Sequence, residues 1–167
     1  LKAVELVTCL SNPDMRIGLD EQGVSLLVNT YATPYKGLGT GDDPKYRKKI
    51  WEVNNISEEW ILYRSAPEGR SIWGGGSSDI LKWEKGIGEL SKSPTAYLRN
   101  VEQWGSNGIL FGMMSDLSST IYSGSAWDTT CCAVIPNNQD YFLPLFCFAK
   151  SEQFTHEVRL FNQKISV

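Results

Sequence analysis

Short apolar runs separated by turn-forming residues are the feature that most constrains the fold of this chain. Runs of four to eight residues bounded by Gly, Pro, Asn, Asp or Ser are typical of β-strands joined by tight turns. The predicted strands cover 3–10, 24–29, 60–65, two short pieces within 71–84, 107–114, 119–125 and 130–136. This pattern predicts a sheet-rich domain.

Helical spacing of apolar residues occurs between these strands and at the C-terminus. In 94–104 the apolar residues recur on one helical face, and Pro94 suits a first turn. The C-terminal stretch repeats this spacing twice, and Ser151 followed by Glu152 marks a new helix start between the repeats. We therefore expect an α+β fold with a mostly antiparallel sheet and a few helices, two of them at the C-terminus.

The chain has the length of a single domain, which we expect to span 1–167. It starts with Leu1 rather than Met, and its first residues lack the pattern of a signal peptide. No apolar run approaches the roughly 18 residues of a membrane span. We expect a segment excised from a longer cytoplasmic polypeptide, without a membrane partner.

Residues suited to metal binding or catalysis are sparse. The four cysteines, Cys9, Cys131, Cys132 and Cys147, form no C-x-x-C pair. Neighbouring cysteines in a strand point to opposite faces, so Cys131 and Cys132 are poorly placed to bond each other or to share a metal. We therefore expect reduced, buried thiols. His156 is the sole histidine, and no G-x-S-x-G elbow accompanies it. These observations predict neither a metal site nor a catalytic triad.

The segment 35–53, YKGLGTGDDPKYRKKIWEV, combines glycines with a cluster of basic residues. Asp43 can cap a helix that begins at Pro44 and continues to Trp51, with Lys45, Lys48 and Lys49 facing outward. One interpretation is a loop followed by a solvated helix. The other is a basic helix on nucleic-acid phosphates, with the glycine loop near base edges. The net charge of −3 disfavours generic nucleic-acid binding, but positive charge on one face would suffice.

The six tryptophans divide into two groups. Four occur in amphipathic segments and are predicted to be core residues: Trp51, Trp60, Trp83 and Trp104. Trp73 and Trp127 occur in polar loops. A loop tryptophan can stack on a base or a sugar, or fold back onto its own sheet, and both interpretations stay open for these two.

The order of several blocks resembles a known family. The blocks are GLGTGDDPKYRKKIWEV, WGGGSSDILKWE, WGSNGILFGMMSDLSSTIYSGSAWDTTCCAVIP and FAKSEQFTHEVRLFNQKISV, which together extend over 36–165. Their order is similar to that in the C-terminal target-recognition region of large bacterial adenine-N6 DNA methyltransferases. That family includes type IIG restriction–modification polypeptides and related phage-defence methylases. Its members have a G-[IL]-x-T-G-D-[ND] block before a basic, aromatic helix.

The resemblance implies a DNA-recognition module that is not itself an enzyme. The family's catalytic [DN]-P-P-[YF] block is missing from the sequence, as is a glycine-rich block for S-adenosylmethionine. We therefore expect no cofactor here, and S-adenosylmethionine in a methyltransferase domain of the same polypeptide, with or without endonuclease activity. The expected partners are double-stranded DNA and that methyltransferase domain.

The resemblance and the charge pattern together suggest which residues meet DNA. Phosphate contacts position a protein on the duplex, whereas base contacts specify the sequence. The candidates for backbone contacts are Lys36, Lys45, Arg47, Lys48 and Lys49. The candidates in loops that approach bases, or the surroundings of a flipped adenine, are Gly39, Thr40, Gly41, Asp42, Arg70, Trp73, Ser77, Asp79, Trp127 and Asp128.

Two other classes of function remain as alternatives. One is a stand-alone carbohydrate- or small-molecule-binding domain that uses Trp73 and Trp127 as stacking platforms. The other is an independent enzyme, which the sequence supports least because no nucleophile–base pair can be assembled from it.

Overall fold

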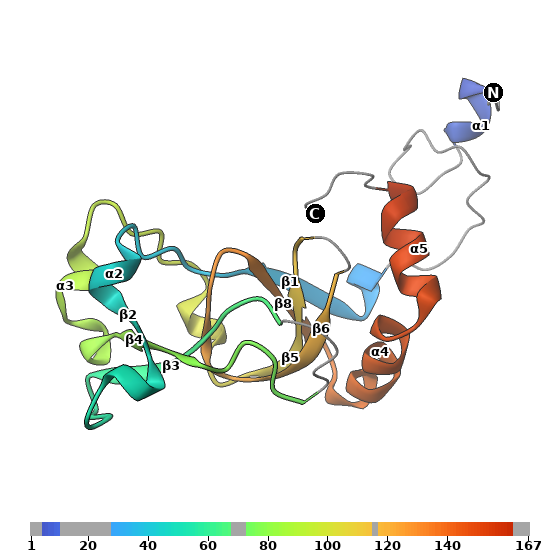
Figure 1. The fold of residues 1–167 in the computed structure, drawn as a ribbon. Helices are drawn as coiled ribbons and strands as arrows, with labels where there is room; N and C mark the ends of the chain where they lie inside the picture. The colour runs from blue at the N-terminus through green and yellow to red at the C-terminus, as the bar shows by residue number, and fades with distance from the viewer. Residues whose placement is uncertain (1–4, 11–27, 68–72, 115–116, 162–167) are drawn as a thin grey trace.

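The computed structural model describes residues 5–10, 28–67, 73–114 and 117–161 (Figure 1). These residues form eight strands and five α-helices. The strands are β1 (Ala32–Lys36), β2 (Arg47–Lys49), β3 (Trp60–Arg64), β4 (Asp79–Lys82), β5 (Asn107–Gly112), β6 (Ser119–Ser123), β7 (Ala126–Trp127) and β8 (Cys131–Pro136). The helices are α1 (Leu6–Cys9), α2 (Asp43–Tyr46), α3 (Glu89–Lys92), α4 (Phe142–Ala149) and α5 (Glu152–Phe161). Short 3-10 turns cover Val28–Thr30, Ile50–Glu52, Glu84–Gly86, Val101–Gln103 and Gln139–Tyr141.

The first sheet has the order β1-β8-β5-β6, and all its pairs are antiparallel. Ile109 lies opposite Val134, and Phe111 lies opposite Cys132. Because side chains alternate along a strand, this register places Cys132 on one face and Cys131 on the other. The predicted opposite orientation of the two thiols is confirmed. Cys131 is buried and Cys132 half-buried, but Cys147 is exposed, so the expectation of a buried thiol is wrong there.

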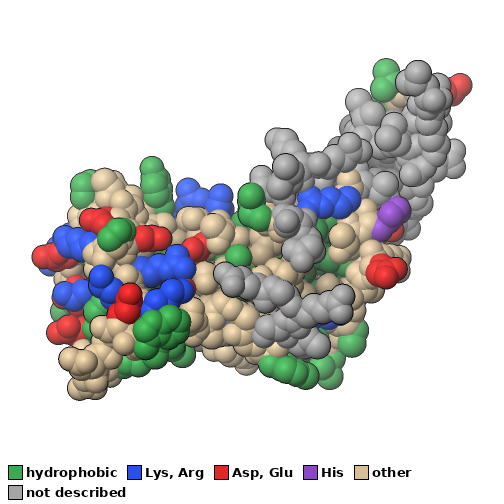
Figure 2. Space-filling view, in the orientation of Figure 1, with side chains coloured by type: hydrophobic (Ala, Val, Ile, Leu, Met, Phe, Trp, Pro, Cys, Tyr) green, Lys and Arg blue, Asp and Glu red, His purple; other side chains and the backbone are tan. Residues whose placement is uncertain are grey.

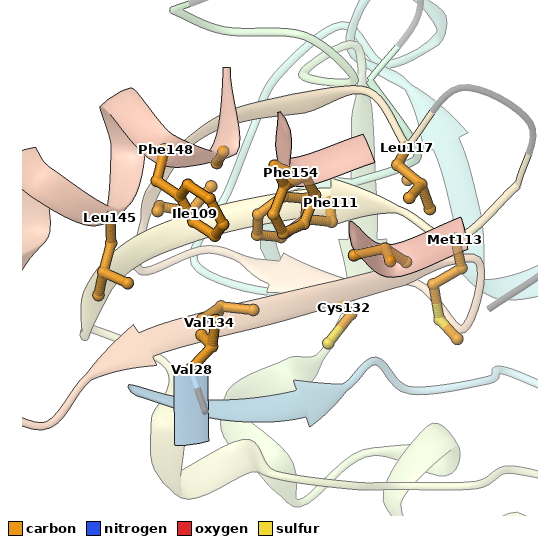
Figure 3. A pocket seen from close by; sticks show the side chains of 13 residues that line it. Val28, Ile109, Phe111, Met113, Leu117, Cys132, Val134, Leu145, Phe148 and Phe154 are labelled. Carbon is orange, nitrogen blue, oxygen red and sulfur yellow. The ribbon is translucent and has the colours of Figure 1, made fainter. Parts of the chain in front are cut away.

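Helices α4 and α5 cover one face of this sheet, as Figure 1 shows. Phe111 of β5 stacks on Phe154 of α5 with ring centroids 5.0 Å apart. Figure 3 shows an apolar cavity of about 200 Å³ at this interface, lined by side chains that include Ile109 and Leu145. The apolar stripes from which these two helices were predicted are thus buried against the first sheet.

The second sheet has the order β2-β4-β3-β7, in which β7 runs parallel to β3 and the other pairs are antiparallel. Tyr63 and Leu81 belong to its buried core, together with Leu38 from the glycine loop. Trp127 of β7 belongs instead to the buried cluster on the face of the first sheet opposite α4 and α5, where its ring meets Tyr122. The β7 strand therefore links the two sheets.

The predicted α+β class, the dominance of antiparallel pairing and the two C-terminal helices are confirmed. The strands predicted at 60–65, 107–114, 119–125 and 130–136 also form, as β3, β5, β6 and β8. Of the two strand pieces predicted within 71–84, one forms as β4, whereas 73–76 form a turn and 71–72 lie outside the described residues. β1 and β7 lie outside every predicted strand.

The helix predicted from Pro44 to Trp51 is wrong beyond Tyr46. After α2 the chain becomes strand β2, because pairing of Arg47–Lys49 with β4 supplies the backbone hydrogen bonds that a helix would have formed. The cap is Asp42, whose carboxylate accepts from the Lys45 amide, rather than Asp43. The 3-10 turn that follows leaves Trp51 72% exposed, so its predicted place in the core is also wrong.

The helix predicted at 94–104 is wrong as well. Asn100 has a left-handed backbone, with φ of 52°, and only the 3-10 turn Val101–Gln103 follows it. Tyr97 forms a β-bridge with Gly39 instead. The strand predicted at 3–10 is helix α1 over Leu6–Cys9, and the one at 24–29 ends in a 3-10 turn, while 24–27 lie outside the described residues.

The glycine loop 37–41 lies between two other segments. Gly39 exchanges backbone hydrogen bonds with Tyr97, and the Leu38 amide donates to the Trp127 carbonyl. A Cβ atom on Gly37 would lie 2.0 Å from the Asp128 carbonyl oxygen, whereas the nearest atom to one on Gly39 is a Thr129 methyl carbon, at 3.2 Å. The glycines therefore permit close backbone approach within the fold.

Gly37→Ala should lower the free energy of unfolding by about 2–3 kcal/mol, because the new methyl group overlaps backbone atoms that cannot yield without shifting a strand. Gly39→Ala is the matched control, with an expected loss below about 1 kcal/mol. Urea denaturation followed by tryptophan fluorescence measures both. Equal stability of the two variants would contradict the structural role assigned to Gly37.

Candidate nucleic-acid interface

Three segments that the sequence analysis singled out meet at one groove of about 800 Å³. They are the basic strand β2 with the turn after it, the glycine-rich loop before β4, and the turn after β7. The groove is lined by Arg47, Lys49, Trp51, Ser65, Ala66, Gly74, Gly76, Ser77, Ser78, Asp128 and Thr130. Residues more than 80 positions apart thus contribute to the same concave surface.

Arg47 lies at the centre of an ion network beneath this groove. Its guanidinium nitrogens lie 2.8 Å from Asp79, 3.2 Å from Asp128 and 3.4 Å from Asp43. Lys49 projects from the same face of β2, and its ammonium lies 2.8 Å from the second oxygen of Asp79. The network joins α2, β2, β4 and the turn after β7.

Asp79 is the most deeply buried member of the network, with its side chain 1% exposed. Burial alone would raise the pKa of its carboxyl group, but the hydrogen bonds and positive charges of Arg47 and Lys49 lower the pKa below its ordinary value. Ser65 donates a further hydrogen bond to the same carboxylate, at 3.2 Å. Burial also opposes the charge of Arg47, yet the paired carboxylates raise its pKa overall.

The alternation of side chains along β2 places the predicted basic residues on two different faces of the strand. Lys48 lies opposite Ile80 in the register and therefore faces away from Arg47 and Lys49. Lys45 lies on α2, where its ammonium is 2.8 Å from Glu89. Figure 2 shows Lys and Arg side chains interspersed with Asp and Glu at the end formed by α2, α3 and β2–β4. Among the described residues, the basic side chains of 45–49 therefore do not share one face, as the predicted basic helix required.

Two exposed indole rings flank the groove. Trp51 lines it directly, and its ring centroid lies 5.9 Å from the Lys49 ammonium. Trp73 is 75% exposed and immediately precedes Gly74 of the groove. Exposed tryptophan beside charged and hydroxyl groups is an arrangement suited to stacking on a planar ligand.

The predicted ligand-facing residues of the loops differ in their burial and contacts. Trp127 is fully buried, and its indole nitrogen donates to the Tyr35 carbonyl, so it presents no ring to a ligand. Thr40 is also buried and bonds Asp43, while Asp42 caps α2. Gly39 and Gly41 approach the 95–97 segment. Thr40 is therefore not available to a ligand, whereas Gly41 and Asp42 are exposed.

The remaining candidates are placed as follows. Ser77 and Asp128 line the groove, and Asp79 supports it from below. Lys36 is exposed at the end of β1 and is not among the groove residues. Arg70 lies outside the described residues.

Sequence reasoning missed several groove residues. Ser65, Ser78 and Thr130 contribute hydroxyl groups, and Trp51 was predicted to be buried. The alternation of Arg47, Lys48 and Lys49 on a strand would have indicated which two basic side chains share a face. Because the sequence analysis predicted a helix over these residues, it did not apply the alternation of a strand.

A comparison with models of known protein families found no match, and neither did a comparison with curated proteins. Within the described ranges, no cluster of His, Cys, Asp and Glu is suited to hold a metal ion. None of the described helices combines the length and apolar character needed to traverse a bilayer.

Asp79→Asn should lower the free energy of unfolding at pH 7 by about 3 kcal/mol, because it leaves Arg47 and Lys49 without their buried counter-ion. Asp43→Asn removes an exposed carboxylate from the same arginine and should cost less than about 1 kcal/mol. Chemical denaturation of both variants measures the difference.

The free energy of unfolding of wild type and that of Asp79→Asn should depend differently on pH. The pKa of Asp79 is lowered in the folded protein, so its stabilisation is present above the unfolded value of about 3.9 and is lost as the pH falls through the folded value. The stability gap between wild type and Asp79→Asn should therefore narrow below about pH 4. A gap that stays constant down to pH 2 would contradict the assignment.

Proposed function

We propose that this chain is a DNA target-recognition module of an adenine-N6-specific DNA methyltransferase, and that the groove beside β2 reads base edges. The observation that supports this most is the convergence of the basic segment, the loop at 74–78 and the turn at 128–130 on one surface. These segments come from the blocks whose order resembles the methyltransferase family. The chemistry of methyl transfer would lie in another domain of the same polypeptide, together with S-adenosylmethionine.

The groove offers both donors and acceptors for base recognition. Arg47 and Lys49 can donate, the carboxylate of Asp128 can accept, and the hydroxyl groups can do either. The major groove of DNA presents a distinct pattern of donors and acceptors for each base pair. A mixed set of groups held in place by an ion network is therefore suited to discrimination among sequences.

The electrostatics of the groove favour specificity over general attraction to phosphates. Arg47 and Lys49 are balanced by Asp43, Asp79 and Asp128. Two cations against three carboxylates leave the network without net positive charge, so it attracts the duplex backbone weakly, and binding should depend only modestly on salt. Lys49 is the more accessible of the two cations, with its side chain 39% exposed compared with 23% for Arg47.

Lys49→Gln should weaken binding to a duplex enriched from a random-sequence library, because it removes a hydrogen-bond donor from the groove. Lys48→Gln is the matched control, because it removes the same charge from the neighbouring position on the opposite face of β2. Replacing Trp51 and Trp73 together with Ala should weaken binding by at least about tenfold. Fluorescence anisotropy at 50 and 200 mM salt measures all three.

Equal affinity of the Lys49→Gln and Lys48→Gln variants for the duplex would contradict the proposal that the groove binds DNA. Binding that is insensitive to both tryptophans would do the same. If tryptophan fluorescence responds to a panel of sugars and nucleosides but not to the duplex, the alternative of a small-molecule-binding domain replaces this proposal.

A further inference from the structure

Helices α4 and α5 do not fill the space between themselves and the first sheet. They leave a cavity of about 200 Å³, whose lining side chains are drawn in Figure 3. The floor of this cavity is formed by Ile109 and Phe111 of β5 and by Cys132 and Val134 of β8. The register pairs these residues across the two strands, so the alternation of side chains places all four on the same face of the sheet.

The roof of the cavity consists of side chains at helical spacing. Leu145, Phe148 and Ala149 occupy positions i, i+3 and i+4 of α4, and Phe154 and Val158 occupy positions i and i+4 of α5. Residues at this spacing lie on one face of a helix. Space remains beneath the roof because Ala149, a buried residue at the end of α4, contributes only a methyl group.

The lining of the cavity is apolar throughout. No charged, hydroxyl or amide side chain occurs among the lining residues, all of which belong to the described part of the chain. Their most polar group is the thiol of Cys132. Burial raises the pKa of this thiol to about 11, so it is neutral at pH 7. Because an ordered water molecule needs several polar partners, these side chains do not provide a site for one.

The volume of the cavity is large for an unfilled interior. Native interiors contain few voids larger than a water molecule, because the atoms around a void lose van der Waals contacts. An engineered apolar cavity of roughly 150 Å³ takes up benzene, and this cavity is larger. Met113, Val134 and Phe148 line it and are only half-buried, so part of their apolar surface remains in contact with solvent. A ligand that covers this surface would be held by the hydrophobic effect.

The walls of the cavity are suited to an aromatic ligand. Phe154 stacks on Phe111 and meets Phe148 edge to face, with ring centroids 5.0 and 5.6 Å apart. Aromatic rings favour both arrangements, so a further ring can extend this cluster. The sulfur atoms of Met113 and Cys132 contribute to the same lining, and sulfur makes favourable contacts with aromatic rings.

We propose that this cavity binds a small uncharged aromatic molecule of one or two rings, between the floor of β5 and β8 and the roof of α4 and α5. A charged ligand would lose its hydration there without gaining a partner. Because the ligand would contact the sheet and both helices, it would stabilise the packing of the C-terminal helices on the sheet. The site is separate from the groove beside β2, since no residue lines both.

Toluene is the probe, and the methyl resonance of Met113 in a carbon–proton correlation spectrum is the readout. Met114, the next residue, is 51% exposed and does not line the cavity, so its methyl group is the internal control. Met113→Leu identifies the relevant peak among the three methionines of the chain. Toluene should shift the Met113 resonance saturably and leave the Met114 resonance unchanged.

Two analogues of toluene test the chemistry of the site. Benzoate has a carboxylate in place of the methyl group and should bind at least about tenfold more weakly, because no lining side chain can pair with its charge. Methylcyclohexane keeps the methyl group but has no aromatic ring, and its affinity in competition with toluene should be roughly threefold lower.

Ala149→Leu should abolish the response to toluene, because the larger side chain occupies the cavity. Cys147→Leu adds a similar side chain at an exposed position of the same helix and should leave the response unchanged. A full response of Ala149→Leu would overturn the proposal. The comparison of toluene with its analogues in the wild-type protein does not require either variant to fold.

Other outcomes would also overturn the proposal. They are the absence of a saturable shift of Met113, an equal shift of Met114, and an affinity for benzoate or methylcyclohexane equal to that for toluene. A response that appears only after Leu26 and Leu27 are replaced with Ser would assign the cavity to that apolar segment of the same chain instead. A Met113 shift that follows protein concentration without toluene would assign it to a second copy of the chain.

Discussion

The buried carboxylate of Asp79 organises the second sheet and the groove above it. It neutralises Arg47 and Lys49, which both extend from one face of β2, and it accepts a hydrogen bond from Ser65 at the end of β3. Arg47 in turn reaches Asp128 in the turn after β7. One buried anion therefore connects four segments, and their separation along the chain explains why no local pattern predicted the arrangement.

The ion network also determines what the groove can do. Side chains that are held by several partners lose little conformational freedom when a ligand binds, so they are preorganised for recognition. The three carboxylates outnumber the two cations, so the network has no net positive charge that would attract a polyanion indiscriminately. The groove thus combines fixed hydrogen-bonding groups with two exposed tryptophans and a small net charge. Under the proposed function, these properties favour contacts with base edges over contacts with phosphates.

The fold was predictable from sequence wherever local pattern and tertiary environment agree. Strands β5, β6 and β8 have apolar runs between clear turn residues, and α4 and α5 have apolar stripes that the first sheet covers. The failures occur where long-range pairing overrides helical spacing. The segment at Arg47–Lys49 pairs with β4, and Tyr97 pairs with Gly39. Such pairings depend on partners distant in sequence and leave no periodic signal of their own.

The candidate site was predictable at the level of segments but not of side chains. The sequence indicated the basic segment, the loop before β4 and the turn after β7, and all three line the groove. Trp127 and Thr40 are buried within the fold, because the glycine loop lies against both neighbouring segments. Whether a loop residue faces solvent or its own sheet depends on this packing, which composition does not encode.

Hydrogen–deuterium exchange of the free chain and of its complex with an enriched duplex tests the central claim most directly. The account predicts that DNA slows amide exchange in 47–51, 74–78 and 128–130, and leaves helix α4 unchanged at the far end of the molecule (Figure 1). Protection concentrated on α4 and α5, or a stable complex without protection in any of the three groove segments, would contradict it.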